Sequence, residues 1–206
     1  MAAGLRRSPR RHPRLAEAVV ADARITAAMR GERYEFRSRL DTCVQAVRLV
    51  VVSDAFLGQV LYRAKARSMA LGVPLLPRLL HRMAIASAGI YIGDEVIVWP
   101  GVYLVHGQVV VEGRVEIRAG VVISPTVTIA QGRADRGPTI GPGVSLGAGS
   151  RVLGAVAVGA RARIGANAVV LADVPEEATA VGVPARISTV PADVDGSAGP
   201  ALRPRP

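Results

Sequence analysis

One histidine is the side chain of this chain that could most readily do chemistry. His106 lies in VYLVHGQVVVEG (102–113), a run of valines that otherwise predicts strand, and the 206 residues include only three histidines. A neutral imidazole can accept the proton of a hydroxyl group, because its unperturbed pKa lies near neutrality. By residue type alone a strand histidine is more often structural than catalytic, so both interpretations stay open at this point.

A polar loop is the second candidate. The stretch AQGRADRGPT (130–139) interrupts a regular hydrophobic pattern and carries Asp135 and Arg136. An arginine side chain can clamp a carboxylate or hydrogen-bond a sugar hydroxyl. A polar loop of this kind is as often a plain surface insertion as a functional loop, so its residue types alone do not assign it a function.

Metal and phosphate-loop chemistry find no support in the sequence. His12 and His81 have no partners at the spacing of metal ligands. The stretch GAGSRVLG (147–154) belongs to a repeat and not to a strand–loop–helix unit that cradles phosphate. We therefore expect no metal ion in the site.

Composition narrows the class of protein further. The net charge is +10, yet residues 92–187 hold eight basic and eight acidic side chains, and no aromatic–basic interleaving accompanies the excess elsewhere, so we expect no nucleic acid partner. The single cysteine, Cys43, excludes an internal disulfide and favours a cytoplasmic location. The most apolar early run (47–62) is shorter than a span of about 20 residues, so we expect no membrane span.

A six-residue hydrophobic repeat begins at Ile92. One seven-residue step separates Leu104 from Val111, and one eleven-residue step crosses the 130–139 loop. Helices require spacings of three and four, whereas short strands joined by equal corners produce a period of six. The sequence therefore predicts a parallel β-helix, whose coils bury their apolar residues by stacking. The repeat positions are Ile92, Val98, Leu104, Val111, Ile117, Ile123, Ile129, Ile140, Leu146, Val152, Val158, Ile164 and Val170.

Helical patterns precede the repeat. We expect a helix over 15–30 and a short helix over 74–87. Between them we expect a helical region over about 35–71, in which 47–62 forms a packed amphipathic helix. Trp99 is expected to cover the first coil. The predicted division is a disordered basic tail (1–14), a helical region (15–88), a β-helix domain (89–187) and a disordered tail (188–206).

The repeat and two later stretches, IGANAVVLADVP (164–175) and VGVPARI (181–187), resemble the left-handed β-helix acyltransferases with hexapeptide repeats, and among them the serine acetyltransferases. The resemblance covers about residues 54–187 and is strongest over 141–187. It implies a left-handed parallel β-helix preceded by α-helices, with acetyl-CoA as co-substrate and the serine hydroxyl as acceptor. It also implies a homotrimer or a dimer of trimers, with active sites between neighbouring subunits.

The resemblance assigns roles to the two candidates. His106 falls where the serine acetyltransferases carry the histidine of an Asp-His-Ala-Thr-Gly stretch, which implies a general base for the acceptor hydroxyl. Asp135 and Arg136 match the Asp and Arg of a Gly-Asp-Arg-His loop that contacts the acceptor.

Three positions depart from the family's pattern. Val105 replaces an Asp that would hold the serine ammonium, and Gly137 replaces the second His of the loop. Tyr91 replaces an Asp that would orient the catalytic imidazole. A general base needs an acceptor at its other ring nitrogen, and the acids near His106 in the sequence are Asp94, Glu95 and Glu112.

The donor side of the resemblance is more complete. Ala148 and Ala166 are one coil apart, where small residues in the family open a groove for the pantetheine arm of coenzyme A. Arg163 and Arg186 match basic positions that could meet the coenzyme A phosphates, although each also suits a solvated surface.

We therefore expect an acetyl-CoA-dependent O-acetyltransferase acting on L-serine or a similar small acceptor. One alternative keeps the chemistry but uses a saccharide or secondary-metabolite hydroxyl, which Val105 and Gly137 make credible. A second alternative is a non-catalytic β-helix that only oligomerises or binds a metabolite.

Overall fold

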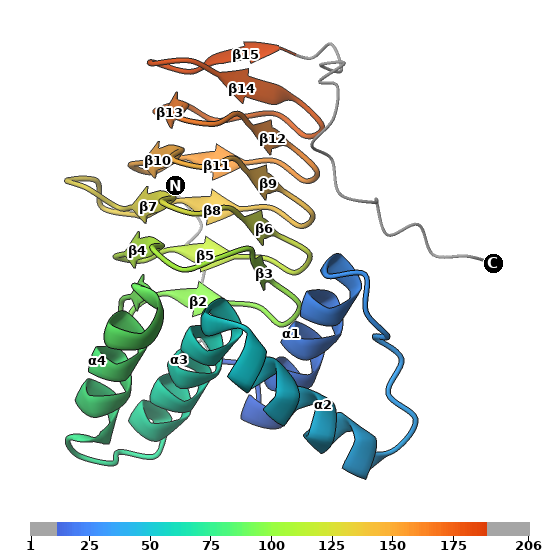
Figure 1. Ribbon diagram of the computed structural model, residues 1–206. Helices are drawn as coiled ribbons and strands as arrows, with labels where there is room; N and C mark the ends of the chain where they lie inside the picture. Colours follow the sequence, from blue (N-terminus) through green and yellow to red (C-terminus); the bar gives the residue numbers. More distant parts are fainter. Residues whose placement is uncertain (1–11, 189–206) are drawn as a thin grey trace, which may run out of the picture.

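The computed structural model describes residues 12–188, so the predicted tails lie largely outside the described residues. A helical base carries a stack of short strands (Figure 1). The helix predicted over 15–30 is present as the first helix, which ends just before Gly31. The four helices are α1 (Leu15–Met29), α2 (Arg39–Val52), α3 (Asp54–Ala70) and α4 (Leu76–Ala88).

The strands form three sheets, and up to β13 every third strand returns to the same sheet, as expected for a left-handed parallel β-helix. All neighbours pair in parallel except the last two strands of sheet C. Sheet A holds β1 (Tyr91–Ile92), β4 (Val110–Glu112), β7 (Thr128–Ala130), β10 (Arg151–Leu153) and β13 (Val169–Val170). Sheet B holds β2 (Ile97–Val98), β5 (Glu116–Ile117), β8 (Thr139–Ile140) and β11 (Ala157–Val158). Sheet C holds β3 (Tyr103–Leu104), β6 (Val122–Ile123), β9 (Ser145–Leu146), β12 (Arg163–Ile164), β14 (Thr179–Val181) and β15 (Arg186–Ser188).

The hydrophobic repeat forms the interior of the β-helix, as predicted. All thirteen repeat positions, from Ile92 to Val170, are buried in one continuous core. Corner glycines allow the coils to stack at strand spacing. A Cβ atom on Gly147 would lie 2.6 Å from the backbone nitrogen of Ala166 in the next coil, so this position requires glycine.

Helix α3 closes the lower end of the β-helix. The first coil has no coil beneath it to pair with its carbonyl groups, and buried unpaired carbonyls are costly. Buried side chains of α3 donate hydrogen bonds to these carbonyls. The bonds run from Gln59 to the Val102 oxygen (2.9 Å), from Tyr62 to the Val96 oxygen (2.8 Å), from Lys65 to the Ile92 oxygen (2.6 Å), and from Arg63 to the oxygens of Val98 and Trp99.

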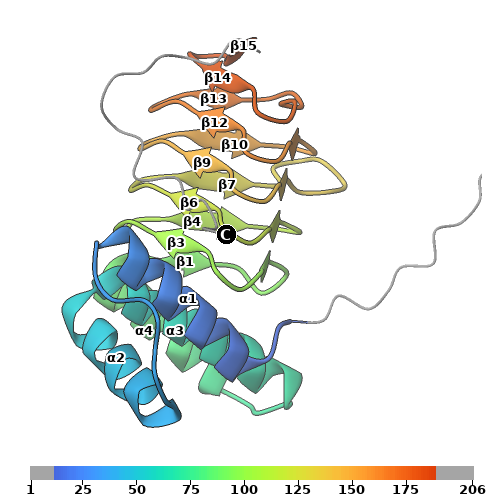
Figure 2. The same ribbon diagram turned by 90° about the vertical axis from the view of Figure 1, so that its right-hand side faces the viewer.

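A buried ion pair fastens α1 to the same coil. Arg63 Nε donates to Asp22 Oδ2 at 2.9 Å, and both side chains are almost fully buried. The Asp22 carboxylate also accepts from the backbone nitrogens of Gly101 and Val102, at 2.8 and 3.3 Å. Figure 2 shows α1 lying below β3. The base therefore fixes the orientation of the first coil.

The helical region predicted over about 35–71 is present, but the single packed helix predicted over 47–62 is wrong, because the chain is interrupted at Ser53. The chain breaks there into α2 and α3, whose axes are bent by 116°. The Ser53 side chain accepts a hydrogen bond from the Phe56 backbone nitrogen at 3.3 Å and so starts a new helix. The 47–62 segment is consequently not one packed helix, and several apolar residues of α2 are exposed.

The prediction that Trp99 covers the first coil is also wrong. Its ring is 38% exposed, Nε1 donates to Glu116 at 2.9 Å, and the guanidinium of Arg118 lies 5.1 Å from the ring centroid. Trp99 therefore belongs to the outside of sheet B, and α3 covers the coil instead.

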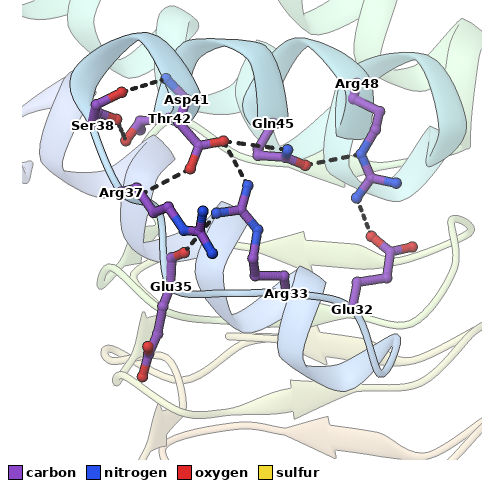
Figure 3. Close-up of polar contacts among 9 residues, drawn as sticks. All are labelled: Glu32, Arg33, Glu35, Arg37, Ser38, Asp41, Thr42, Gln45 and Arg48. Carbon is purple, nitrogen blue, oxygen red and sulfur yellow. Dashed lines mark hydrogen bonds and ion pairs between the residues drawn. The ribbon is translucent and has the colours of Figure 1, made fainter.

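A polar network holds the connection between α1 and α2 (Figure 3). Ser38 caps α2 by accepting from the Asp41 backbone nitrogen at 3.1 Å, and Asp41 pairs with Arg33 at 2.7 Å. Arg48 of α2 reaches back to Glu32. Within residues 12–188 no single helix is long and apolar enough to cross a bilayer, and only the bent α2–α3 pair meets those criteria together.

Candidate functional site

His106 lies in the corner that joins β3 to β4, on the edge where sheet C turns into sheet A. We call this edge the His106 edge; it comprises residues 105–109, 124–127, 147–150 and 165–168. The seven-residue step predicted from the sequence is the extra residue of this corner. A Cβ atom on Gly107 would lie 1.7 Å from the Ala88 oxygen, and the Gln108 nitrogen donates to that oxygen at 2.9 Å. The end of α4 therefore holds the corner beside His106.

Among residues 12–188, no acid lies in position to orient His106. Its side chain is exposed and forms no hydrogen bond with any residue in 12–188. Asp94 pairs with Lys65 at 2.9 Å and Glu95 pairs with Arg114 at 3.3 Å, both away from the His106 edge. Glu112 is the last residue of β4, on the side of the strand where sheet A turns into sheet B.

Tyr91 does not take over the orienting role. Its ring packs edge-on against His81 of α4, with the ring centroids 4.9 Å apart.

Ala148 and Ala166 lie on the His106 edge, two and three coils further along the axis. Stacking is fixed by hydrogen bonds from the Gly149 nitrogen to the Pro125 oxygen (3.0 Å) and from the Asn167 nitrogen to the Ala148 oxygen (2.8 Å). At strand spacing, the two alanines stand about 10 and 14 Å above the level of His106. Both are exposed, so this edge carries small side chains above the histidine.

The two candidate phosphate-binding arginines lie on the strands beside this edge. Arg163 in β12 is exposed on the outer face of sheet C, three residues before Ala166. Arg186 in β15 is exposed and pairs with Val181 at the end of β14. The sequence-predicted donor residues thus lie on coils beyond that of His106, and Arg186 lies in the last strand of sheet C.

Asp135 and Arg136 lie on a different edge. Their loop projects between β7 and β8, where sheet A turns into sheet B (Figures 1 and 2). We call this the loop edge; it comprises residues 93–96, 113–115 and 131–138. Both side chains are exposed. One chain therefore does not bring the loop to His106.

The loop edge explains one departure from the family pattern. A Cβ atom on Gly137 would lie 2.8 Å from the Arg114 oxygen, so a histidine there would require the loop to move. Gln131 secures the loop base, because it accepts from the Arg114 nitrogen at 2.8 Å and donates to the Ala134 oxygen at 2.6 Å.

A cleft of about 380 Å³ that the sequence did not point to lies between α4 and the outer face of sheet A. Its lining includes Arg78, His81 and Glu112. Burial and the nearby Lys65 lower the pKa of His81. The only sequence signal was that Arg78 and His81 are three residues apart and therefore share one helix face. The described residues contain no group of three or more side chains placed to hold a metal ion.

Known proteins resemble this chain in sequence. The family model "Bacterial transferase hexapeptide (six repeats)" matches residues 137–172. A serine acetyltransferase of Helicobacter pylori (strain J99) is 42% identical over 118 residues, which cover 55% of this chain and 69% of the relative. A serine acetyltransferase of Synechococcus elongatus (PCC 7942) is 36% identical over 119 residues, which cover 56% of this chain and 49% of that protein.

Solved structures agree with the sequence comparison. Soybean serine acetyltransferase complexed with serine is 30% identical, with a TM-score of 0.69 over 84% of this chain and 69% of that chain. Serine acetyltransferase of Brucella abortus in complex with coenzyme A is 27% identical, with a TM-score of 0.69 over 82% and 66% of the two chains. The repeat and the three-sided coil define a hexapeptide-repeat transferase. Together with these relatives, they show that the chain belongs to the serine acetyltransferase family.

Proposed function

We propose that this chain is an acetyl-CoA-dependent O-acetyltransferase that acts on the hydroxyl of L-serine or a similar small acceptor. The observation that carries the proposal is that His106, Ala148 and Ala166 lie on one edge of the β-helix. Relatives in complex with serine and with coenzyme A support both substrates. A cytoplasmic location accords with the single cysteine.

In the proposed reaction the His106 imidazole takes the proton of the acceptor hydroxyl as the oxygen attacks the thioester carbonyl carbon. An alcohol is otherwise a weak nucleophile. The carbon–sulfur bond then breaks, the acetyl group stays on the acceptor oxygen, and the proton returns from the imidazole to the leaving sulfur. Ala148 and Ala166 leave room for the pantetheine arm, and Arg163 and Arg186 meet the phosphates.

The proposal includes a trimer whose active sites lie between neighbouring subunits. His106 and the Asp135–Arg136 loop lie on different edges of one chain, and packing one chain's loop edge against the next chain's His106 edge would join them. A face of α2 supports pairing of two trimers, because its apolar residues recur on one side and are 54–78% exposed. These residues are Leu40, Val44, Val47 and Val51. Sedimentation of the full chain as a trimer or hexamer would support this assembly, and a monomer would contradict it.

A panel of acceptors tests the proposed reaction. Purified protein is incubated with acetyl-CoA and each acceptor, and the appearance of free thiol is followed together with the mass of the product. We expect thiol release that depends on L-serine. If no hydroxyl compound in the panel increases thiol release, the enzymatic proposal is overturned in favour of a non-catalytic β-helix.

A saccharide or secondary-metabolite hydroxyl is the second candidate acceptor. The observation that favours it is that Val105 and Gly137 stand where the family has an Asp and a His. Turnover with a sugar and none with L-serine would select this candidate and leave the donor side unchanged.

A further inference from the structure

The cleft beside α4 has the size and the polarity of a small-molecule site. Its volume of about 380 Å³ falls within the range of about 300–1,000 Å³ seen for ligand pockets. Its lining residues come from helix α4, from the first two strands of sheet A, and from the corners that follow these strands. Arg78 and His81 enter from the helix, and Glu112 enters from the end of β4.

Ion pairs with residues outside the cleft neutralise two of the charges that line it. Asp94 is paired with the buried Lys65, and Glu95 is paired with Arg114. Burial and Lys65 lower the pKa of His81, which favours the neutral form of its imidazole.

One cation and one anion remain open in the cleft. Arg78 and Glu112 form no ion pair with any residue of the described chain. A guanidinium binds a carboxylate through paired hydrogen bonds, and a carboxylate binds an ammonium group. The open charges are therefore complementary to a small zwitterion and not to a singly charged ligand.

Arg114 connects the cleft to the loop that carries Asp135 and Arg136. Arg114 pairs with Glu95 at the rim, and its backbone nitrogen donates to Gln131 at the loop base. In the proposed trimer this edge faces the His106 edge of the neighbouring chain. On that neighbour, Val105 offers no carboxylate to an ammonium group.

We propose that the cleft between α4 and sheet A recognises a zwitterionic acceptor, with Arg78 contacting its carboxylate and Glu112 contacting its ammonium group. Glu112 thereby supplies the charge that Val105 lacks. This inference rests on the proposed function, because the acceptor bound in the cleft must present its hydroxyl to His106 of the neighbouring chain.

The test uses the full chain and three acceptors: L-serine, L-serinamide, which lacks the carboxylate, and 3-hydroxypropionate, which lacks the ammonium group. Arg78→Gln and Glu112→Gln are the test variants. Arg82→Gln on the same helix and Glu35→Gln are the controls, since neither lines the cleft. The KM for each acceptor and the KM for acetyl-CoA are measured for all variants.

Each test variant should raise the KM for L-serine about tenfold or more, because a charge-assisted contact is lost, while the KM for acetyl-CoA stays unchanged. Glu112→Gln should leave 3-hydroxypropionate unaffected, and Arg78→Gln should leave L-serinamide unaffected. A general disturbance of the fold would instead move all three acceptors together. An L-serine KM within twofold of the wild-type value in both variants, or equal shifts for all acceptors, would overturn the inference.

Equilibrium binding separates this inference from the proposed reaction. If L-serine is not acetylated, its binding to each variant is measured by titration calorimetry. Binding that is weakened about tenfold by both test variants and by neither control would uphold the cleft while the proposed function fails. No binding to the wild-type chain, or equal binding to all variants, would overturn the cleft as a recognition site.

Discussion

At the scale of single residues, His106 combines exposure with a fixed backbone. Its corner is held by the contact of Gly107 and Gln108 with Ala88, whereas the imidazole forms no hydrogen bond with any residue of 12–188. The histidine is therefore placed by the backbone and not by a side-chain partner. No group of residues 12–188 is placed to orient its second ring nitrogen, so in the proposed reaction we expect a substrate or a neighbouring chain to do so.

Replacing this histidine tests its proposed role as a general base. His106→Ala should lower kcat by about 10²-fold or more, the effect typical of removing a general base. The dissociation constant of acetyl-CoA should not change, because the donor contacts lie on later coils. Stopped assays of thiol release and equilibrium binding check the two parts, and an unaltered kcat would remove His106 from the mechanism.

The small side chains above His106 allow a second test. Ala166→Leu should close the proposed groove and raise the KM for acetyl-CoA about tenfold or more, with little effect on the acceptor KM. Ala157→Leu is the matched control, because Ala157 is an exposed alanine of β11 in the same coil, on the outer face of sheet B and outside both edges. Equal effects of the two substitutions would argue against a donor groove at Ala166.

At the scale of elements, α3 does the work that a further coil would otherwise do. Its polar side chains pair with carbonyls of the first coil, and its apolar side chains join both cores. Helix α4 then packs along α3 and ends against the corner of His106. The helices of the base are therefore in direct contact with the corner that carries His106.

Removing the buried arginine of α3 should destabilise the whole base. Arg63→Met leaves the buried Asp22 carboxylate without its cation and two backbone oxygens without a donor. We expect the free energy of unfolding to fall by about 3–5 kcal/mol in chemical denaturation. Arg67→Met, an exposed position on the same helix, should change it by less than about 0.5 kcal/mol. A small effect of Arg63→Met would show that the contacts of Arg63 with Asp22 and the first coil are dispensable for stability.

We expect the fold to lose stability at alkaline pH because of Tyr62. Burial raises the pKa of its hydroxyl to about 12, above the ordinary value near 10. Because the pKa is higher in the folded state than in the unfolded state, the neutral Tyr62 hydroxyl makes its full contribution to stability, up to about 3 kcal/mol, below pH 10. This contribution is lost as the pH rises from 10 towards 12.

Urea denaturation at pH 9 to 12 checks the Tyr62 prediction. The stability difference between the wild type and Tyr62→Phe should shrink as the pH rises, while Tyr34→Phe, at an exposed tyrosine, should track the wild type throughout. A difference that stays constant with pH would contradict the assignment.

Sequence and structure agree where a pattern is strictly local. The period of six follows from the corner geometry, so the β-helix and every buried repeat position could be predicted from spacing alone. The break at Ser53 was missed because an apolar run continues through it, and only the cap to Phe56 reveals the bend. The cleft with Arg78 and Glu112 was missed because its walls are 34 residues apart in sequence and meet only through α4 packing.

At the scale of the whole molecule, the candidate residues separate into two edges. His106 and the donor positions share one edge, whereas Asp135, Arg136 and the cleft share the other. In the proposed function, a single chain presents two halves of a site. Catalysis then requires that neighbouring chains bring these halves together.

Mixing two inactive variants tests this requirement most directly. His106→Ala chains and Asp135→Ala/Arg136→Ala chains carry different purification tags, are unfolded and refolded together, and the mixed oligomers are isolated through both tags. Some interfaces in a mixed trimer then join an intact His106 edge to an intact loop edge. We predict serine-dependent thiol release well above that of either parent oligomer. Release no greater than the average of the two parents would contradict an active site shared between chains.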